Sequence, residues 1–317
     1  MRSTTFAALV ACSLLPSALA ATYGLTDNHV GADFLNTFTH EAIADPTHGR
    51  VNYVNQATAV AQNLTYAHGN TLVLRADHTT VLSASGPGRN SVRIRSVKTY
   101  KTHVSVFDIA HMPQGCGTWP AAWETDESNW PNGGEVDIVS GVNDQSPNTV
   151  SLHTSANCNM PASRTMTGQA TVNNCDVNTD GNSGCGVSAP SANSYGPSFN
   201  SGGGGFYAME RTTSFIKVWF WPRSGSVPND LKSGASSINT DNWGTPTAYF
   251  PNTSCDINSH FDANNIIINL TLCGDWAGQS SVFNGAGCSG SCVDLVNNNP
   301  GAFVNAYWQI NAVRVYT

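Results

Sequence analysis

Charged residues are scarce in this 317-residue sequence, because Asp, Glu, Lys and Arg together make up only 11% of it. The 21 acidic residues outnumber the 14 basic ones, which argues against a nucleic acid as partner, since phosphates attract basic surfaces. No apolar run reaches the roughly 18 residues needed to span a bilayer. No long segment has helical periodicity. These absences indicate a β-rich protein that meets an uncharged partner.

The first twenty residues predict a secretory signal peptide. Arg2 provides a positive start, residues 6–15 are apolar, and Ala-Leu-Ala at 18–20 matches the small-x-small cleavage pattern. Cleavage there would leave residues 21–317 as a secreted, extracellular chain. This chain has no linker or internal repeat, so we expect one domain and a monomer, without a cofactor or a metal. Three glycosylation sequons could carry glycans, the last of them in an apolar run that makes burial a possibility: Asn63, Asn252 and Asn269.

Cysteines spaced as CxxC are missing, which argues against a zinc site. Of the nine cysteines, Cys12 lies in the signal segment. The other eight, an even number in a secreted protein, indicate a disulfide framework whose pairing stays open. Cys288 and Cys292 are close enough for a local bridge. Three others crowd a segment rich in Gly, Asn and Ser: Cys158, Cys175 and Cys185.

Many short runs have the composition and alternation of β-strands, and turn residues such as Ser-Gly-Pro-Gly at 85–88 separate them. The pattern predicts an all-β protein built as a two-sheet sandwich. The predicted strands are 71–76, 92–97, 103–109, 135–140, 149–154, 206–211, 216–221, 265–273 and 303–316.

One predicted strand carries two acidic residues on the same face. Glu135 and Asp137 are two positions apart, which is the side-chain period of a strand. Neighbouring carboxylates repel, and such a pair is usually kept for acid–base or nucleophilic chemistry. Ser140 lies five positions after Glu135 and would face the other side of a regular strand. A β-bulge at Ile138 or Val139 would turn it back toward the two carboxylates.

This stretch resembles the active-site strand of glycoside hydrolase family 16, the laminarinase and lichenase group. The laminarinase-type motif is Glu-x-Asp-x-x-Glu, and the sequence keeps its first two acids as Glu135 and Asp137. Ser140 stands where the family has its second Glu. The similarity extends from about Thr22 to the C-terminus and is closest to secreted basidiomycete-type endo-β-1,3(4)-glucanases. Further similar segments are 86–94, 117–123, 130–134, 151–154 and 273–278.

The resemblance implies a concanavalin-like β-jelly roll with an open substrate cleft for a β-glucan. It implies that Glu135 is the nucleophile of a retaining hydrolase, that Asp137 shares a proton or hydrogen bond with it, and that Ser140 occupies the acid/base position. Trp123, Trp130 and Trp276 would be sugar platforms, because indole stacks on the apolar face of glucose. Core packing is the alternative for these tryptophans.

Two more residues are expected in the cleft. Arg93 would hydrogen-bond sugar hydroxyls or the nucleophile, with a surface ion pair as the alternative. His153 would lie across from the acid/base position and hydrogen-bond the acid/base or the leaving sugar, with a purely structural role as the alternative. Trp119 and Glu124 are interpreted as supporting or core residues.

Ser140 cannot protonate a leaving sugar, because its hydroxyl titrates far above physiological pH. General acid catalysis contributes about a hundred- to ten-thousand-fold, so hydrolysis should be impaired. A water could relay the proton, or Asp144 could reach in. The leading hypothesis is therefore an impaired endo-β-1,3(4)-glucanase, and the alternative is a non-catalytic β-glucan-binding protein. A third hypothesis, a serine engineered to trap substrate, is weakened by the signal segment.

Overall fold

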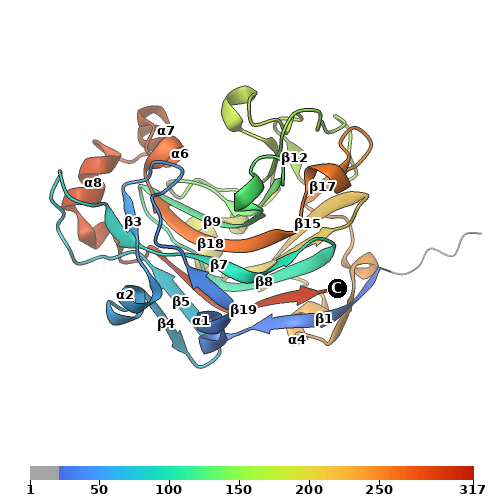
Figure 1. The fold of residues 1–317 in the computed structure, drawn as a ribbon, viewed down its shortest axis with the longest axis horizontal. Helices are drawn as coiled ribbons and strands as arrows, with labels where there is room; N and C mark the ends of the chain where they lie inside the picture. The colour runs from blue at the N-terminus through green and yellow to red at the C-terminus, as the bar shows by residue number, and fades with distance from the viewer. Residues whose placement is uncertain (1–20) are drawn as a thin grey trace, which may run out of the picture.

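The computed structural model describes residues 21–317, so the predicted signal segment and Cys12 lie outside the described residues. Two large antiparallel sheets pack face to face as a sandwich (Figure 1). Helices are short, and the longest in the described chain, α8 (Cys292–Asn298), has seven residues. None of the helices between residues 21 and 317 is long and apolar enough to cross a bilayer. The predicted all-β jelly-roll sandwich is confirmed.

The larger sheet has nine strands and forms the face remote from the site described below. Its main path runs through seven strands, and a hairpin of two more attaches to β19. In spatial order they are β16 (Ser237–Asn239), β1 (Thr22–His29), β19 (Tyr307–Tyr316), β8 (His103–His111), β14 (Gly205–Arg211), β15 (Phe215–Pro222) and β17 (Ala248–Pro251), with β5 (Thr71–Arg75) and β4 (Thr65–His68) beside β19.

The smaller sheet has eight strands and carries the candidate site on its outer face. A separate two-stranded parallel ribbon joins β3 (Val51–Tyr53) to β6 (Arg89–Ser91). The strands of the smaller sheet are, in spatial order, β12 (Gln169–Ala170), β13 (Cys185–Ser188), β11 (Thr149–His153), β10 (Glu135–Ser140), β9 (Thr118–Thr125), β18 (Asn264–Leu272), β7 (Arg93–Tyr100) and β2 (Phe38–His40).

Each of the nine predicted strands coincides with an observed strand, apart from small shifts at the ends. The last prediction begins too early, because residues up to Phe303 form a 3₁₀ turn and β19 starts at Tyr307. The prediction omits ten of the nineteen strands in residues 21–317, among them β9, the strand between β10 and β18. Pro120 and two alanines give β9 a weak strand propensity, which its pairing with both neighbours overrides.

The core lies between the sheets and follows from alternation along the strands. In β10 the side chains of Val136, Ile138 and Val139 are fully buried. Trp308 on β19 is also fully buried and donates its indole N–H to the Asn269 carbonyl of β18. Each large apolar side chain buried in this way contributes about 1.5–3 kcal/mol, so the core holds the two sheets in a defined relation.

Four disulfides link the eight cysteines of residues 21–317, and one expectation about them was wrong. Cys288 and Cys292 do not bridge each other; each ties the segment around α8 to a different part of the sheet region. Closeness in sequence does not decide pairing, because β-strand packing brings Cys116 and Cys273 next to them. The bridges are Cys116–Cys288, Cys158–Cys255, Cys175–Cys185 and Cys273–Cys292.

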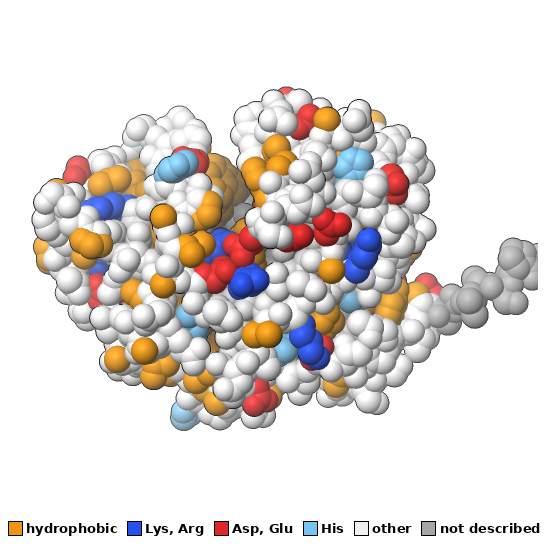
Figure 2. Space-filling model, in the orientation of Figure 1, with side chains coloured by type: hydrophobic (Ala, Val, Ile, Leu, Met, Phe, Trp, Pro, Cys, Tyr) orange, Lys and Arg blue, Asp and Glu red, His pale blue; other side chains and the backbone are white. Residues whose placement is uncertain are grey.

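Two groups of connections rise above the outer face of the smaller sheet (Figure 1). One contains α6 (Gly274–Ala277), α7 (Ser280–Gly285) and α8, and the other contains β12 and its flanking loops. Figure 2 shows an open notch between these two rims in the space-filling view. The notch runs over β9, which agrees with the predicted open cleft. The remaining helices, α1 (Phe34–Thr37), α2 (Gln56–Ala61), α3 (Gly196–Ser201), α4 (Asn229–Ser233) and α5 (Ile257–His260), lie in other connections.

Candidate active site

A β-bulge brings position 140 to the same face of the sheet as the two carboxylates. Along β9, alternate residues pair in turn with Glu135, Asp137 and Ser140, and the register shifts between Asp137 and Val139. Ile138 is therefore the extra residue of β10. The β9 partners of the three polar residues, which share one face, are Thr125, Trp123 and Ala121. The expected bulge and the orientation of Ser140 toward the carboxylate face are both present.

Glu135, Asp137 and His153 form a compact polar cluster. One side-chain oxygen or nitrogen from each lies within 4.8 Å of the other two. His153 Nε2 is 3.2 Å from Asp137 Oδ2, and Trp130 donates its indole N–H to Glu135 Oε2 at 2.7 Å. On the other side of the ring, His153 Nδ1 lies 2.9 Å from Asn182 Oδ1. Two acceptors flank the His153 ring, so it is suited to donate from both nitrogens.

The position of His153 differs from the expectation in one respect. His153 pairs with Glu135 in the β10–β11 register and contacts Asp137, so it does not lie across from position 140. The β10–β11 register explains the error, because it sets His153 opposite Glu135, at the far end of β10 from Ser140. Asp137 makes its close contact with His153, and no direct hydrogen bond joins it to Glu135 in the described chain.

Electrostatics in this cluster raise the pKa values of both Glu135 and His153. Burial, and then the negative charge of Asp137, raises the pKa of Glu135 to about 7, although His153 and the Trp130 hydrogen bond oppose this. Burial disfavours the charged form of His153, but the Asp137 hydrogen bond and the charges of both carboxylates outweigh it and raise the pKa to about 9. At neutral pH a protonated His153 therefore neutralises part of the carboxylate charge.

The same three groups have metal-ligand chemistry, and the protonation of His153 opposes it. Two carboxylates and an imidazole within 4.8 Å are the only set of this kind in residues 21–317. A metal needs a neutral imidazole with a free lone pair. The raised pKa of His153 means that a metal would have to displace a proton from the ring at neutral pH, which lowers its apparent affinity.

Trp123 lies half-buried on the face of the carboxylates and is held from two sides. Its indole N–H donates to Asn269 Oδ1 at 2.8 Å, and the guanidinium of Arg93 lies 5.0 Å from the ring centroid. The Asn269 amide also donates to the hydroxyl of Tyr53 at 3.1 Å. This arrangement presents a fixed indole to the cleft, consistent with a sugar platform.

Arg93 forms ion pairs, as the alternative expected, but they are buried and not on the surface. Arg93 is 4% exposed, so it is not part of a surface ion pair. Its Nε donates to Glu41 at 2.8 Å and its Nη2 donates to Glu127. Arg93 is thus held by buried ion pairs with its guanidinium over the Trp123 ring.

Trp130 and Trp276 both expose indole surface. Trp130 is 44% exposed, which contradicts core packing, and it also contacts the nucleophile position. Trp276, on α6, is half-buried and meets Trp119 edge to face at 5.6 Å. Trp119 lies on the same face of β9 as Trp123 by strand alternation, so of its two interpretations, supporting or core, the supporting one fits.

Asp144 lies outside the cluster of Glu135, Asp137 and His153 and is tied to the loop before β9. Its carboxylate accepts the N–H of Gly115 at 2.7 Å, on the loop before β9, and burial raises its pKa. Glu124 is fully buried on the opposite face of β9 and accepts from Ser105 at 2.9 Å. Within residues 21–317, the cluster whose side-chain oxygen and nitrogen atoms lie within 4.8 Å of one another contains no carboxyl group besides those of Glu135 and Asp137.

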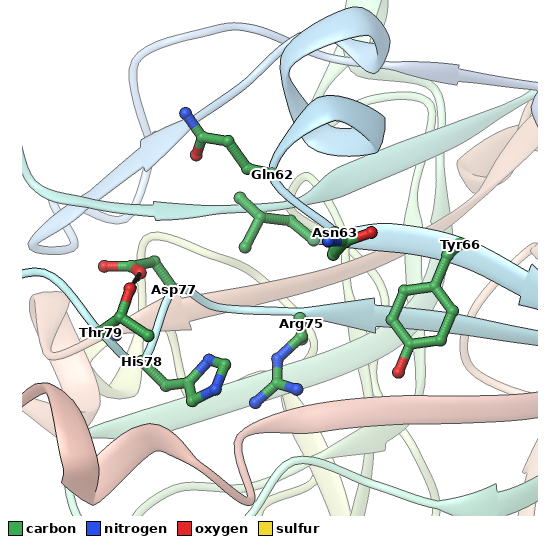
Figure 3. Close-up of a pocket in the computed structure, with 8 residues that line it drawn as sticks. Gln62, Asn63, Tyr66, Arg75, Asp77, His78 and Thr79 are labelled. Atoms are coloured by element: carbon green, nitrogen blue, oxygen red, sulfur yellow. Dashed lines mark hydrogen bonds between the residues drawn. The ribbon is translucent and has the colours of Figure 1, made fainter.

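A second hollow, of about 450 Å³, lies near β4 and β5 and lacks the features of a catalytic site (Figure 3). Arg75 and His78 lie next to each other on one side of it, with Asp77 close by. The Asp77 carboxylate is engaged by Arg89 at 2.9 Å and by Thr79 at 2.9 Å. The candidate catalytic groups Glu135, Asp137 and His153 therefore belong to the cleft and not to this hollow.

Several contributing residues were not found from the sequence. Trp119, named from the sequence only as a supporting or core residue, could have been placed in the cleft by counting back four positions from Trp123 on a strand. Asn269 is marked in the sequence only by its sequon, which points to a glycan, although it is 6% exposed and both amide atoms are engaged. Asn182 lies in the loop closed by the Cys175–Cys185 bridge, and no local pattern signals its contact with His153.

Comparison with known proteins identifies the family of the chain. Residues 38–316 match the family model described as "XgeA-like, catalytic GH16 domain". A probable glycosidase of Schizosaccharomyces pombe is 43% identical over 304 residues, which cover 95% of this chain and 71% of that protein. A probable endo-1,3(4)-beta-glucanase of Aspergillus niger is 42% identical over 97% of this chain, which spans only 42% of that relative. The chain belongs to glycoside hydrolase family 16.

Solved structures support the same assignment. Laminarinase 16A from Phanerochaete chrysosporium, solved with two 6-O-glucosyl-laminaritriose molecules in its donor and acceptor sites, is 80% identical, with a TM-score of 0.93. The match covers 94% of this chain and all of that one. An elongating family 16 β-1,3-glucosyltransferase is 40% identical, with a TM-score of 0.87, and the match covers 93% of this chain and all of that one.

Proposed function

We propose that this protein is a retaining endo-β-1,3(4)-glucanase-type hydrolase whose turnover of ordinary glucans is impaired at position 140. The observation that carries the proposal is the bulged β10 strand, which brings Glu135, Asp137 and Ser140 to one face above an open cleft. Glu135 lies beside protonatable His153, and Trp123, Trp130 and Trp276 expose indole surface nearby. A laminarin-like β-glucan chain suits this combination of aromatic and polar groups.

The chemistry separates into two steps of different difficulty. In the first, the Glu135 carboxylate forms an ester bond with the anomeric carbon while the bond to the leaving sugar oxygen breaks. That oxygen must take a proton, which Ser140 cannot supply, so solvent has to provide it. In the second step, water attacks the ester and releases Glu135, again without a base at position 140.

A non-catalytic β-glucan-binding protein is the second candidate. The serine at position 140 favours it, because binding does not require a general acid. The cluster of Glu135, Asp137 and His153 favours residual chemistry, since gripping a neutral polymer does not need two adjacent carboxylates and their desolvation cost.

The test is the variant Ser140→Glu, with Ser140→Gln as its matched control. Retaining glycosidases place their two carboxyl groups about 5–5.5 Å apart, and a Glu side chain on the bulged backbone should reach that distance. Laminarin turnover, measured as reducing-sugar release, should rise at least about a hundredfold in Ser140→Glu. Ser140→Gln has the same length without a transferable proton and should gain nothing. If Ser140→Glu folds and binds glucan without activity, the binding-protein hypothesis becomes the better account.

The place of action belongs to the same proposal. Eight cysteines in four bridges suit an oxidising compartment, which supports secretion and a signal peptide over residues 1–20. Asn63 and Asn252 are exposed and accessible to glycosylation. We propose a secreted monomeric glycoprotein, and mass spectrometry and light scattering of the secreted chain would test both properties.

A further inference from the structure

The geometry points to Asn148 as a positioning residue that locks the bulge in β10 and so directs position 140 toward Glu135. Asn148 immediately precedes β11 and is fully buried. Its Oδ1 accepts the N–H of Ser140 at 3.0 Å, and its Nδ2 donates to the carbonyl of Ile138 at 2.9 Å. One side-chain amide therefore joins the two residues that flank Val139.

This contact supplies what the strand ladder lacks at that point. A bulge leaves its extra residue without a regular partner, and Ile138 is the residue that the β9 register skips. A buried backbone N–H or carbonyl without a partner is costly, so an unclamped bulge would favour another register. A register slip by one residue would turn position 140 to the opposite face. The Asn148 amide opposes that slip from the β11 side.

Asn148 is itself held rigidly enough to act as a clamp. Its backbone N–H donates to Ser194 Oγ at 2.9 Å, and its carbonyl accepts the N–H of Ala189 at 2.9 Å. Asparagine suits the task because its amide presents a donor and an acceptor at once, whereas an ionised carboxylate presents only acceptors. The Asn148 amide bonds only backbone atoms of β10, so it would orient any side chain at position 140 in the same way.

The role of Asn148 in catalysis rests on the proposed function, but its role in holding the bulge can be tested without an activity assay. Amide hydrogen exchange of Ser140, followed by NMR in the full chain, should accelerate at least about fivefold in Asn148→Ala, because its buried acceptor is lost. The control is Asn200→Ala, because the Asn200 amide likewise accepts a backbone N–H and donates to a backbone carbonyl, both of Met112 and each at 2.9 Å. This control should leave the exchange rate of Ser140 unchanged. Unchanged Ser140 exchange in folded Asn148→Ala would overturn the clamp.

The second experiment uses the Ser140→Glu background. Adding Asn148→Ala should lower laminarin kcat at least about tenfold, because the introduced acid is misplaced, while glucan Kd stays within about twofold. An aryl β-glucan oligoside, whose leaving group needs little protonation, should lose much less activity. Equal losses on both substrates would show a merely structural residue and would overturn the positioning role.

A third variant keeps the proposal testable if Asn148→Ala does not fold. In Asn148→Asp, the carboxyl group regains a donor toward Ile138 only when protonated, so laminarin turnover in the Ser140→Glu background should recover at low pH relative to that parent. Absence of recovery would contradict the clamp. A wholly inactive Ser140→Glu chain would refute the proposed function instead, and the exchange rate of Ser140 would then decide on the clamp alone.

Discussion

Trp130 donates its indole N–H to Glu135 at 2.7 Å, so a tryptophan predicted as a sugar platform is also a direct partner of the proposed nucleophile. The hydrogen bond favours the charged form of Glu135 and opposes the effects of burial and of Asp137 on its pKa. A sugar stacked on this indole would therefore contact the side chain that hydrogen-bonds the Glu135 carboxylate. We therefore expect sugar binding and the ionisation of Glu135 to be coupled through Trp130.

Trp130→Phe should raise the pKa of Glu135, because it removes a donor to the carboxylate and keeps an aromatic ring. Wild-type attack on an aryl β-glucan oligoside should rise with pH through about 7, where Glu135 ionises. In the variant, this limb of the kcat/KM profile should move upward by roughly half to one pH unit. Trp276→Phe, which leaves the Glu135 contact intact, should not move it. An unshifted limb in Trp130→Phe would contradict the coupling.

His153 should contribute stability with a defined pH dependence. Its folded-state pKa of about 9 lies above the ordinary 6.5, so the contribution is fully present below pH 6.5 and is lost as pH rises through 9. Chemical denaturation should show wild type more stable than His153→Asn by on the order of 2–3 kcal/mol near pH 6, with the difference vanishing above about pH 9.5. His48→Asn, which breaks an exposed pair with Asp275, should change little. A pH-independent difference would exclude a charged His153.

Trp276→Ala should weaken binding of laminari-oligosaccharides at least about tenfold in calorimetric titrations, because an aromatic contact and its buried area are lost. Trp119→Ala should also weaken binding, since Trp119 supports Trp276 edge to face. The double variant should lose less than the two single effects combined, as contacting residues are not independent. Trp221→Ala, on the opposite sheet, is the control, and unchanged affinity in Trp276→Ala would remove that residue from the site.

Asn269 should carry no glycan in the secreted protein, whereas Asn63 and Asn252 should be accessible acceptors. Asn269 is buried, and its amide holds Trp123 and Tyr53 in place. Peptide mass spectrometry with and without glycosidase treatment would locate the modified sites. A glycan on Asn269 of the folded chain would be incompatible with this amide network and would contradict the placement of Trp123.

The local features of the catalytic strand were predictable because they depend on short-range geometry. The two-residue period of a strand places Glu135 and Asp137 on one face wherever that strand lies in the fold. The odd spacing of Ser140 required an extra residue, and the structure places it at Ile138, one of the two predicted positions. The nine predicted strands were found for the same reason, since their alternating side chains reflect burial on one face.

Features that depend on which strands become neighbours were not predictable in the same way. β9 has weak strand propensity and forms because β10 and β18 pair with its two edges. The position of His153 depends on the β10–β11 register, and the bridges of Cys288 and Cys292 depend on packing around α8. Arg93 had an evident charge but no evident partner, because Glu41 and Glu127 approach it from other parts of the chain.

The sequence by itself determined the family motif, the paired carboxylates and the absence of an acid at position 140, because residue identity and spacing are local properties. Only the tertiary structure decided that Ser140 returns to the carboxylate face, and that Asn148, from outside that strand, holds it there. The physical reason is that hydrogen bonds between distant segments satisfy the backbone groups that a bulge leaves unpaired. Those partners are chosen by the packing of whole sheets, which no short stretch of sequence encodes.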